Sequence, residues 1–273
     1  LKVGIVGLAN VGKSTLFNAL AEQEVAEVGN YPFTTVEPNV ATVQVPDKTL
    51  LKLKQFLKVP RAIPTTIKFV DIAGLIKGAH KGEGLGNQFL AHIRNMDALA
   101  IVLRAFENPS ASFEPLSPKE QLEIIQEELR QKDRETLVKK AEELRKEVKA
   151  DKEKEKFLTL IEQMIRLIDE GESLKNAYQQ ADKEERAFLR SLFLLSLKPY
   201  FLVLNVSEKD LNKSPSHFGL KEALLISAKT EKELSELSVS EQKEYLSVLG
   251  LKEKALKRII RRAYELLGLI TFY

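Results

Sequence analysis

The sequence lacks cysteine and tryptophan entirely, in a chain of 273 residues. The absence of cysteine excludes disulfide bonds and thiolate metal sites, and a reducing, cytoplasmic compartment is expected. No apolar run approaches the ~18 residues that a membrane-spanning helix needs, so no membrane partner is expected. The chain opens directly on a short apolar run, without a charged and then apolar leader, and we expect no secretory signal.

The sequence also has little excess of charge of either sign. Its 42 basic and 39 acidic side chains leave a net charge of +3, which does not by itself demand a nucleic-acid partner. Three scattered histidines, His80, His92 and His217, do not resemble a metal-binding cluster. Apolar residues make up 44% of the chain, enough for the core of one large domain or two small ones.

Residues 7–14 read GLANVGKS and match the Walker A phosphate loop in full. An expected strand, Lys2–Val6, precedes the motif, and a helical pattern over 15–21 follows it. In this setting the loop's N–H groups and a helix N-terminus point at one place and attract phosphate oxygens. The ammonium of Lys13 can serve the outer phosphates, and the hydroxyl of Ser14 can bind magnesium. The predicted phosphate-binding residues are Asn10, Val11, Gly12, Lys13, Ser14 and Thr15.

Two further segments fit the surroundings of a magnesium–phosphate site. Asp71 follows the apolar run Ile67–Val70, where its carboxylate can hold magnesium through water, and the N–H of Gly74 can contact a terminal phosphate. In the Pro-flanked segment 30–39, a threonine can lend its hydroxyl to the same ion, although an ordinary surface loop is an equal alternative.

Five glycines between residues 74 and 86 indicate a mobile second switch, since their spacing is not that of a dinucleotide-binding motif. His80 lies within this stretch. A solvated loop histidine is the favoured interpretation of it, and a residue that positions water is the alternative.

Two polar segments follow apolar runs where a base would bind, namely 205–208 and 227–229. The usual guanine reader is Asn-Lys-x-Asp, whose Asp accepts from guanine N1–H and the N2 amino group. Here Val206 and Glu208 replace the Lys and the Asp, and the longer Glu cannot keep the same two bonds. Adenine then becomes admissible, although segment 205–208 could also be a helix N-cap. The predicted base-side residues are Asn205, Val206, Glu208, Ser227, Ala228 and Lys229.

The pattern along the chain predicts an α/β fold with a mainly parallel sheet and an inserted helical hairpin of coiled-coil type. Expected domains are a first nucleotide-binding part over 1–114, the helical insert over 115–197 and a second nucleotide-binding part over 198–273. The charge runs of the insert favour solvated helix faces over a nucleic-acid site. Expected strands are Lys2–Val6, Val40–Val45, Ile67–Val70, Ala98–Leu103, Tyr200–Leu204 and Ala223–Ile226, and expected helices follow Lys13 and Gly86, fill much of Lys119–Ser196 including Lys183–Leu195, and cover Lys252–Leu267.

With these motifs in place, the sequence resembles the YchF family, the Obg-like ATPases of the translation-factor-related class of Ras-like P-loop proteins. The resemblance implies a Ras-like nucleotide domain that slowly hydrolyses ATP, with GTP also accepted by some members. It implies magnesium held at Ser14 and Thr35, with the catalytic positions at Lys13, Thr35 and Gly74. It also implies binding to the ribosome and a link to translation and stress responses. Contact with the large subunit and with RNA, and a monomeric state, are further expectations. The segments that carry it are Gly7–Thr15, Asn30–Asn39, Asp71–Asn87, Phe106–Asn108 and Asn205–Glu208.

Two features set limits on that resemblance. Family members usually continue past the position of Tyr273 into a small β-rich TGS domain, which this sequence does not include. Leu75 stands where Ras-like switches carry the water-orienting Gln, as it does in the family, so slow intrinsic turnover is expected. A conventional GTPase and a nucleotide-gated binding module with negligible hydrolysis are therefore the alternative hypotheses.

Overall fold

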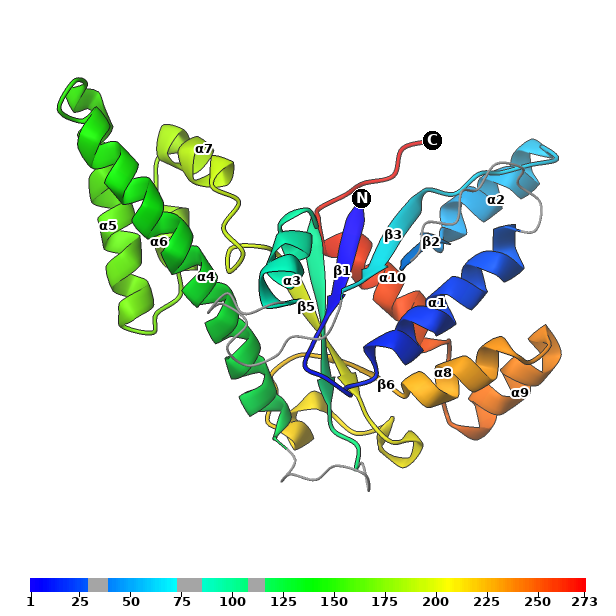
Figure 1. Cartoon of the computed structure of the whole chain (residues 1–273). Helices are drawn as coiled ribbons and strands as arrows, with labels where there is room; N and C mark the ends of the chain where they lie inside the picture. Colours follow the sequence, from blue (N-terminus) through cyan, green and yellow to red (C-terminus); the bar gives the residue numbers. More distant parts are fainter. Residues whose placement is uncertain (29–38, 73–84, 108–115) are drawn as a thin grey trace. The chain divides into compact units, whose positions relative to one another are not determined.

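The computed structural model describes residues 1–28, 39–72, 85–107 and 116–273 (Figure 1). The chain divides into two compact units. The first comprises Leu1–Leu75, Asn95–Leu122 and Pro199–Tyr273, and the second comprises Ile76–Arg94 and Glu123–Lys198. The domain boundaries expected from the sequence, after residues 114 and 197, stay a prediction.

In the residues that the structure describes, the first unit is built on a six-stranded sheet in the order β2-β3-β1-β4-β5-β6. The antiparallel pair is β2 with β3, and every other neighbouring pair is parallel, which confirms the expected mainly parallel sheet. The strands lie within two residues of their expected bounds. They are β1 (Lys2–Val6), β2 (Val40–Gln44), β3 (Thr66–Asp71), β4 (Ala98–Arg104), β5 (Tyr200–Asn205) and β6 (Leu224–Ile226).

The core of this unit packs two helices against one face of the sheet. Apolar side chains of α1 (Lys13–Val28) and α10 (Ala255–Leu266) join those of the sheet in a single cluster. The central strands are near-continuous apolar runs, as in parallel strands covered on both faces, and Ala98–Leu103 of β4 is buried throughout.

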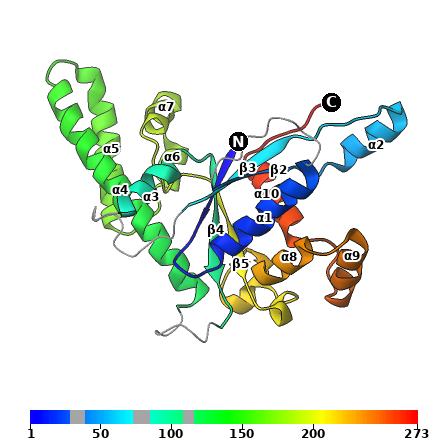
Figure 2. The ribbon, with the colours of Figure 1, turned by 45° about the vertical axis from the view of Figure 1, so that its right-hand side comes forward.

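Three helices of the first unit were not expected from the sequence: α2 (Lys48–Leu57), α8 (Ala228–Ser235) and α9 (Val239–Val248). Side chains cap their N-termini, with Asp47 Oδ1 accepting from the backbone N–H of Leu50 at 2.9 Å. Helix α8 lies beside α1, as the two ribbon views agree (Figures 1 and 2). Short 3₁₀ turns cover Glu208–Asp210 and Pro215–Phe218.

The helix expected from Lys252 begins three residues later, at Ala255. The buried carboxylate of Glu231 accepts from the backbone N–H groups of Ala255 at 2.7 Å and Leu256 at 3.4 Å. An acceptor at this point satisfies the first free N–H groups of the helix and so defines its start.

The second unit is helical. Apolar side chains at three- and four-residue steps of α4 (Pro118–Glu147) and α5 (Glu155–Asp169) share one cluster, which includes Leu137, Leu144, Ile161 and Met164. Helix α7 (Lys183–Ser191) stops short of its expected end at Leu195, because Phe193 adopts a positive φ of 49°. The helices are α3 (Leu85–Arg94), α4 (Pro118–Glu147, whose first turn belongs to the first unit), α5 (Glu155–Asp169), α6 (Lys175–Gln180) and α7 (Lys183–Ser191), with a 3₁₀ turn at Lys152–Lys154. None of the helices in the described ranges combines the length and apolarity that crossing a membrane requires.

Candidate nucleotide-binding site

The loop that joins β1 to α1 has the compact backbone that the Walker A motif requires. Asn10 and Gly12 adopt φ angles of 60° and 98°. A Cβ at Gly7 would lie 2.5 Å from the carbonyl oxygen of Val102, and a Cβ at Gly12 would collide with the side chain of Asn205. Both glycines are therefore required for the loop to pass this close to its neighbours.

Lys13, the first residue of α1, lies folded over this loop. Lys13 is only 7% exposed, and its Nζ donates to the carbonyl oxygen of Leu8 at 2.7 Å. Burial lowers the pKa of the Lys13 ammonium, and the charge of Asp71 opposes that shift. The lysine is thus held at the mouth of a loop whose N–H groups favour anions.

Ser14 and Asp71, two predicted magnesium ligands, meet beside the loop. The sheet register pairs Ile5 with Asp71, which brings the end of β3 next to the start of the phosphate loop. The hydroxyl of Ser14 donates to Asp71 Oδ2 at 3.1 Å. The other carboxylate oxygen, Oδ1, is buried and finds no hydrogen-bond partner among the described residues. Burial raises the pKa of Asp71, while the Ser14 hydrogen bond and the charge of Lys13 oppose the rise.

These oxygen donors suit magnesium. A buried carboxylate oxygen without a partner, next to a hydroxyl, is the kind of hard ligand that Mg²⁺ prefers. Across the described ranges no group of three or more Asp, Glu or His residues could hold a metal ion alone. A magnesium ion here would thus complete its shell with waters and substrate phosphates. Four residues of the sequence-based hypothesis, Thr35, Gly74, Leu75 and His80, lie outside the described residues.

Asn205 connects the phosphate loop to the base-side loops. The sheet register aligns Arg104, Asn205 and Ile226, so the ends of β4, β5 and β6 lie level. Asn205 is buried, its Nδ2 donates to the carbonyl of Val11 at 2.9 Å, and its Oδ1 accepts from the N–H of Ala228 at 3.0 Å. Its side chain therefore positions two loops at once.

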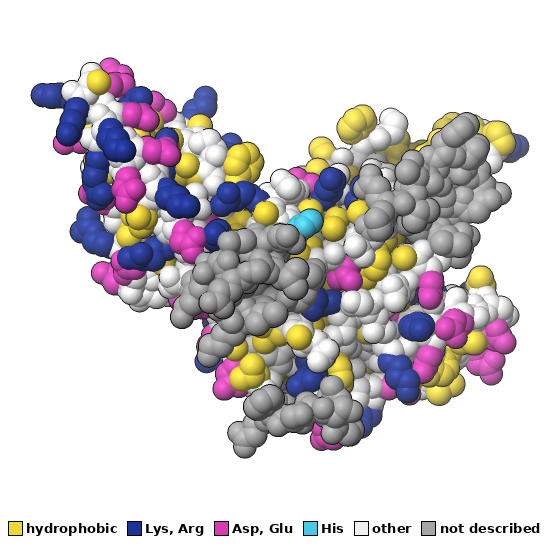
Figure 3. Space-filling view, in the orientation of Figure 1, with side chains coloured by type: hydrophobic (Ala, Val, Ile, Leu, Met, Phe, Trp, Pro, Cys, Tyr) yellow, Lys and Arg dark blue, Asp and Glu magenta, His cyan; other side chains and the backbone are white. Residues whose placement is uncertain are grey.

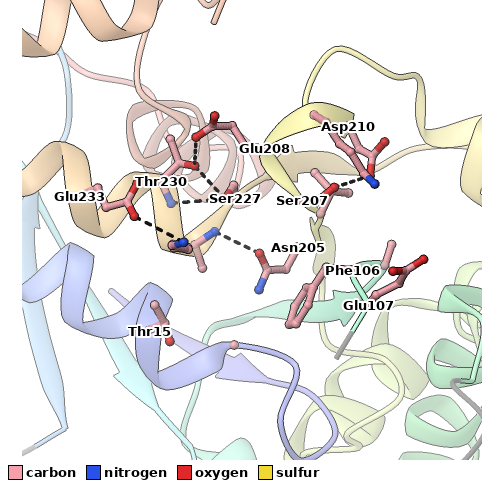
Figure 4. Close-up of a pocket in the computed structure, with 16 residues that line it drawn as sticks. Thr15, Phe106, Glu107, Asn205, Ser207, Glu208, Asp210, Ser227, Thr230 and Glu233 are labelled. Atoms are coloured by element: carbon pink, nitrogen blue, oxygen red, sulfur yellow. Dashed lines mark hydrogen bonds and ion pairs between the residues drawn. The ribbon is translucent and has the colours of Figure 1, made fainter. Parts of the chain in front are cut away.

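Glu208 is held by hydroxyl groups (Figure 4). Its Oε2 accepts from Thr230 Oγ1 at 3.1 Å and from the Tyr245 hydroxyl at 3.0 Å. Thr230 Oγ1 also lies 2.9 Å from Ser227 Oγ, which caps α8. The carboxylate is thus oriented by α8 and α9, two helices that the sequence analysis did not predict.

The other residues predicted on the base side are Val206, Ala228 and Lys229, and they lie in different environments. Val206 is buried, and its N–H donates to the carbonyl of Ile226 at 2.8 Å. Ala228 uses its backbone N–H to hold Asn205. The side chain of Lys229 is 86% exposed and lies 3.8 Å from Glu233, so its ammonium faces solvent.

A cavity of about 630 Å³ opens among these groups. Gly12 and Thr15 line it from the phosphate-loop side, and the segments after β4, β5 and β6 complete it. Phe106, Glu107 and Thr230 also line the cavity but were not predicted as site residues from the sequence. Phe106 and Glu107 were findable, because they lie just after an apolar strand whose end meets the others at one sheet edge.

A mainly parallel six-stranded sheet with a Walker A loop after its first strand and a cavity at the strand ends defines a P-loop protein of the GTPase fold. The model of the 50S ribosome-binding GTPase family matches residues 2–142. All of this chain aligns with the "Ribosome-binding ATPase YchF" proteins of Escherichia coli O157:H7, at 40% identity and 77% of that protein, and of Bacillus subtilis, at 39% identity and 78%. A solved structure of the Schizosaccharomyces pombe YchF GTPase has a TM-score of 0.82 and 33% identity, covering 99% of this chain and 76% of that one. The chain therefore belongs to the YchF family.

Proposed function

We propose that this protein is a magnesium-dependent nucleoside triphosphatase that prefers ATP, with GTP as a weaker substrate. In the proposal its nucleotide state controls its binding to the large ribosomal subunit, and it works as a cytoplasmic monomer in the regulation of translation. The bacterial relatives carry the name of ribosome-binding ATPases, whereas the fission-yeast relative is described as a GTPase. The names of these relatives therefore do not decide which base this protein prefers.

In this proposal each residue predicted to serve the phosphates has a role. Lys13 and the N–H groups from Asn10 to Thr15 would hold the phosphate oxygens. Ser14 would bind magnesium directly, Asp71 through water, and Thr35 would complete the protein ligands. Bound magnesium would neutralise phosphate charge, and the N–H of Gly74 would contact the terminal phosphate.

The state of Glu208 is the observation that carries the preference for adenine. Guanine recognition needs a carboxylate that accepts from both N1–H and the N2 amino group. In this chain Glu208 Oε2 already accepts from Thr230 and Tyr245. Adenine offers neither of the two guanine donors, so it loses nothing when this carboxylate is committed elsewhere. A site that lacks the polar group recognising a base selects that base only weakly over others.

A nucleotide-binding panel tests the base preference. Isothermal titration with ATP, GTP and their non-hydrolysable analogues, with and without magnesium, should give the tightest binding for ATP with magnesium. Equal or tighter binding of GTP would show a conventional GTPase and overturn the preference.

Hydrolysis and ribosome binding need a second measurement. Single-turnover hydrolysis should be slow alone, because Leu75 cannot orient water, and faster with ribosomes. Co-sedimentation with isolated large subunits should differ between the ATP-analogue and ADP states. If ribosomes never accelerate hydrolysis, the protein is a nucleotide-gated binding module instead. If both nucleotide states bind equally, nucleotide control fails.

A further inference from the structure

The segment that contains α2 differs in charge from the rest of the chain. Residues 47–64 include five basic side chains and one acidic side chain, Asp47. The carboxylate of Asp47 is occupied, since it accepts from the Leu50 N–H at 2.9 Å and from the Tyr273 hydroxyl at 2.7 Å. A local charge of +4 on 18 residues therefore exceeds the net charge of +3 of all 273 residues.

Among the described residues, no carboxylate forms an ion pair with the four lysines of this segment. Lys48, Lys52 and Lys58 are exposed and Lys54 is half-buried, and none of the ion pairs of the described chain includes them. Burial of part of the Lys54 stem still leaves its charge uncompensated. The segment thus presents a concentration of positive charge that a polyanion would neutralise.

The helical unit offers no comparable attraction for a polyanion, although it is far richer in charge. Residues 123–198 contain 17 basic and 18 acidic side chains, a net charge of −1. Several of its cations are paired, such as Arg134 with Asp169 at 2.6 Å and Arg145 with Glu162 at 2.8 Å. Basic and acidic side chains are interspersed over α4 and α5 in Figure 3.

Helix α2 also exposes apolar side chains next to its lysines. Phe56 is 82% exposed and Leu51 is 59% exposed. Lys48, Lys52 and Phe56 follow one another at four-residue steps, so they share one face of the helix. The exposed face therefore carries two ammonium groups and an aromatic ring in one row.

A groove of about 670 Å³ lies between α2 and α10. Val45, Pro46 and Leu50 contribute apolar surface to it, while Lys54 of α2 and Lys257 of α10 bring ammonium groups. Across the groove, Arg261 is held by Glu253 through two contacts of 3.0 Å, which fixes one wall. The lining carries four basic side chains against two acidic ones, Asp47 and Glu253. Apolar surface with a net positive surround suits a planar base and its flanking phosphates.

We propose that α2 and the α2–α10 groove bind single-stranded or looped RNA, with phosphates on the lysines and an unstacked base on Phe56 or in the groove. The RNA would be ribosomal, a step that rests on the proposed association with the ribosome. A lipid surface is the competing partner, because most apolar side chains of α2 lie on a different side of the helix from its basic ones. RNA is favoured because the adjoining groove places basic side chains around apolar surface, which suits a base with its phosphates, and the vesicles in the test separate the two partners.

The test uses a charge-reversal variant of the full chain, Lys48→Glu/Lys52→Glu/Lys54→Glu. Its matched control, Lys139→Glu/Lys146→Glu/Lys149→Glu, makes the same change at exposed lysines of α4 and its end. The probes are purified ribosomes, a fluorescent mixed-sequence single-stranded RNA and vesicles of phosphatidylserine and phosphatidylcholine. A further variant, Phe56→Ala, removes the aromatic ring and keeps the charge, and circular dichroism and ATP titration show whether each variant is folded.

We expect the α2 variant to bind RNA and ribosomes at least about tenfold more weakly at about 0.1 M salt, with a shallower dependence on salt. The control triple should change binding less than about twofold, and Phe56→Ala should weaken RNA binding about fivefold or more. Equal losses in the two triples would overturn the assignment to α2, as would binding of vesicles in place of RNA.

The same measurements distinguish failure of the proposed ribosome binding from failure of the proposed RNA surface. If the parent protein binds RNA through α2 but does not sediment with ribosomes, the RNA surface stands and the ribosomal partner is wrong. If it sediments with ribosomes and the α2 variant does so equally, the RNA surface is wrong and the ribosomal partner stands. Unchanged ATP affinity in every variant separates both results from damage to the nucleotide site.

Discussion

The side-chain Nδ2 of Asn205 donates to the carbonyl oxygen of Val11 at 2.9 Å, across 194 positions of sequence. The same amide accepts the N–H of Ala228 at 3.0 Å. One buried side chain thus fixes the distance between the loop proposed to hold the phosphates and the loop proposed to hold the base. Because both contacts are to backbone groups, the link does not depend on which side chains Val11 and Ala228 carry.

Asn205→Ala should weaken binding of ATP and GTP alike. The substitution leaves a buried carbonyl and a buried N–H without partners, at about 1–3 kcal/mol each. We expect a free energy of unfolding lower by about 2–4 kcal/mol and a nucleotide affinity at least about tenfold weaker. Chemical denaturation and isothermal titration measure the two effects.

A surface asparagine supplies the control for that substitution. Asn212 Nδ2 also donates to a carbonyl, that of Leu249 at 3.1 Å, but the contact is exposed. Asn212→Ala should therefore cost less than about 1 kcal/mol and leave nucleotide binding unchanged. If Asn205→Ala binds one base normally and loses only the other, Asn205 reads the base instead of connecting the loops.

Lys13→Ala should abolish triphosphate binding while the protein stays folded. The ammonium is held at the loop by a 2.7 Å bond to the Leu8 carbonyl, so it stands ready for an incoming phosphate. We expect at least a hundredfold loss of affinity, about 3 kcal/mol for a lost charge-assisted contact. Lys243→Ala, on the exposed face of α9, serves as control. Parental affinity in Lys13→Ala would mean that the site is not a nucleotide site.

The sequence was a sufficient guide where a local pattern determines local structure. The apolar runs before Gly7 and after Pro199 became β1 and β5, since buried parallel strands need continuous apolar residues. The meeting of Ser14 with Asp71 was also foreseeable, because carboxyl ends of neighbouring parallel strands share one edge.

Contacts between distant segments could not be predicted in the same way. No local pattern around Glu208 indicates that Tyr245, 37 residues later, would bind its carboxylate. Helix α2 was missed because five of its ten residues are Lys, Thr or Gln, and none of its leucines is fully buried. Two signals were available, the cap by Asp47 and the helical spacing of Leu50, Leu53 and Leu57.

Restoring the guanine reader should invert the base preference. In Val206→Lys/Glu208→Asp the shorter carboxylate no longer reaches Thr230 and Tyr245 and becomes available to guanine. We expect the ratio of GTP to ATP affinity to rise about tenfold or more. Tyr245→Phe, which removes one of the two hydroxyl donors to Glu208, should shift the ratio less and in the same direction. A ratio unchanged in both variants would refute the role given to Glu208.

Asp133 should make the stability of the helical unit depend on pH between about 4 and 6. Burial raises its pKa from 3.8 to about 6, against the opposing hydrogen bonds from Ser196 and Leu195 and the charge of Arg94. The folded state therefore holds the proton more tightly than the unfolded state. The resulting stabilisation is complete below pH ~4 and is lost as the pH rises through about 6.

The stability lost through ionisation of Asp133 should be at most ~3 kcal/mol in the free energy of unfolding, measured by urea denaturation from pH 4 to 7. Asp133→Asn should flatten this part of the profile, because the amide does not titrate. Asp169→Asn should act in the opposite sense and weakly, because the exposed Asp169 beside Arg134 has a lowered pKa and stabilises at higher pH. A parent profile that rises from pH 4 to 6 and is unaltered by Asp133→Asn would show that the buried carboxylate titrates in its ordinary range.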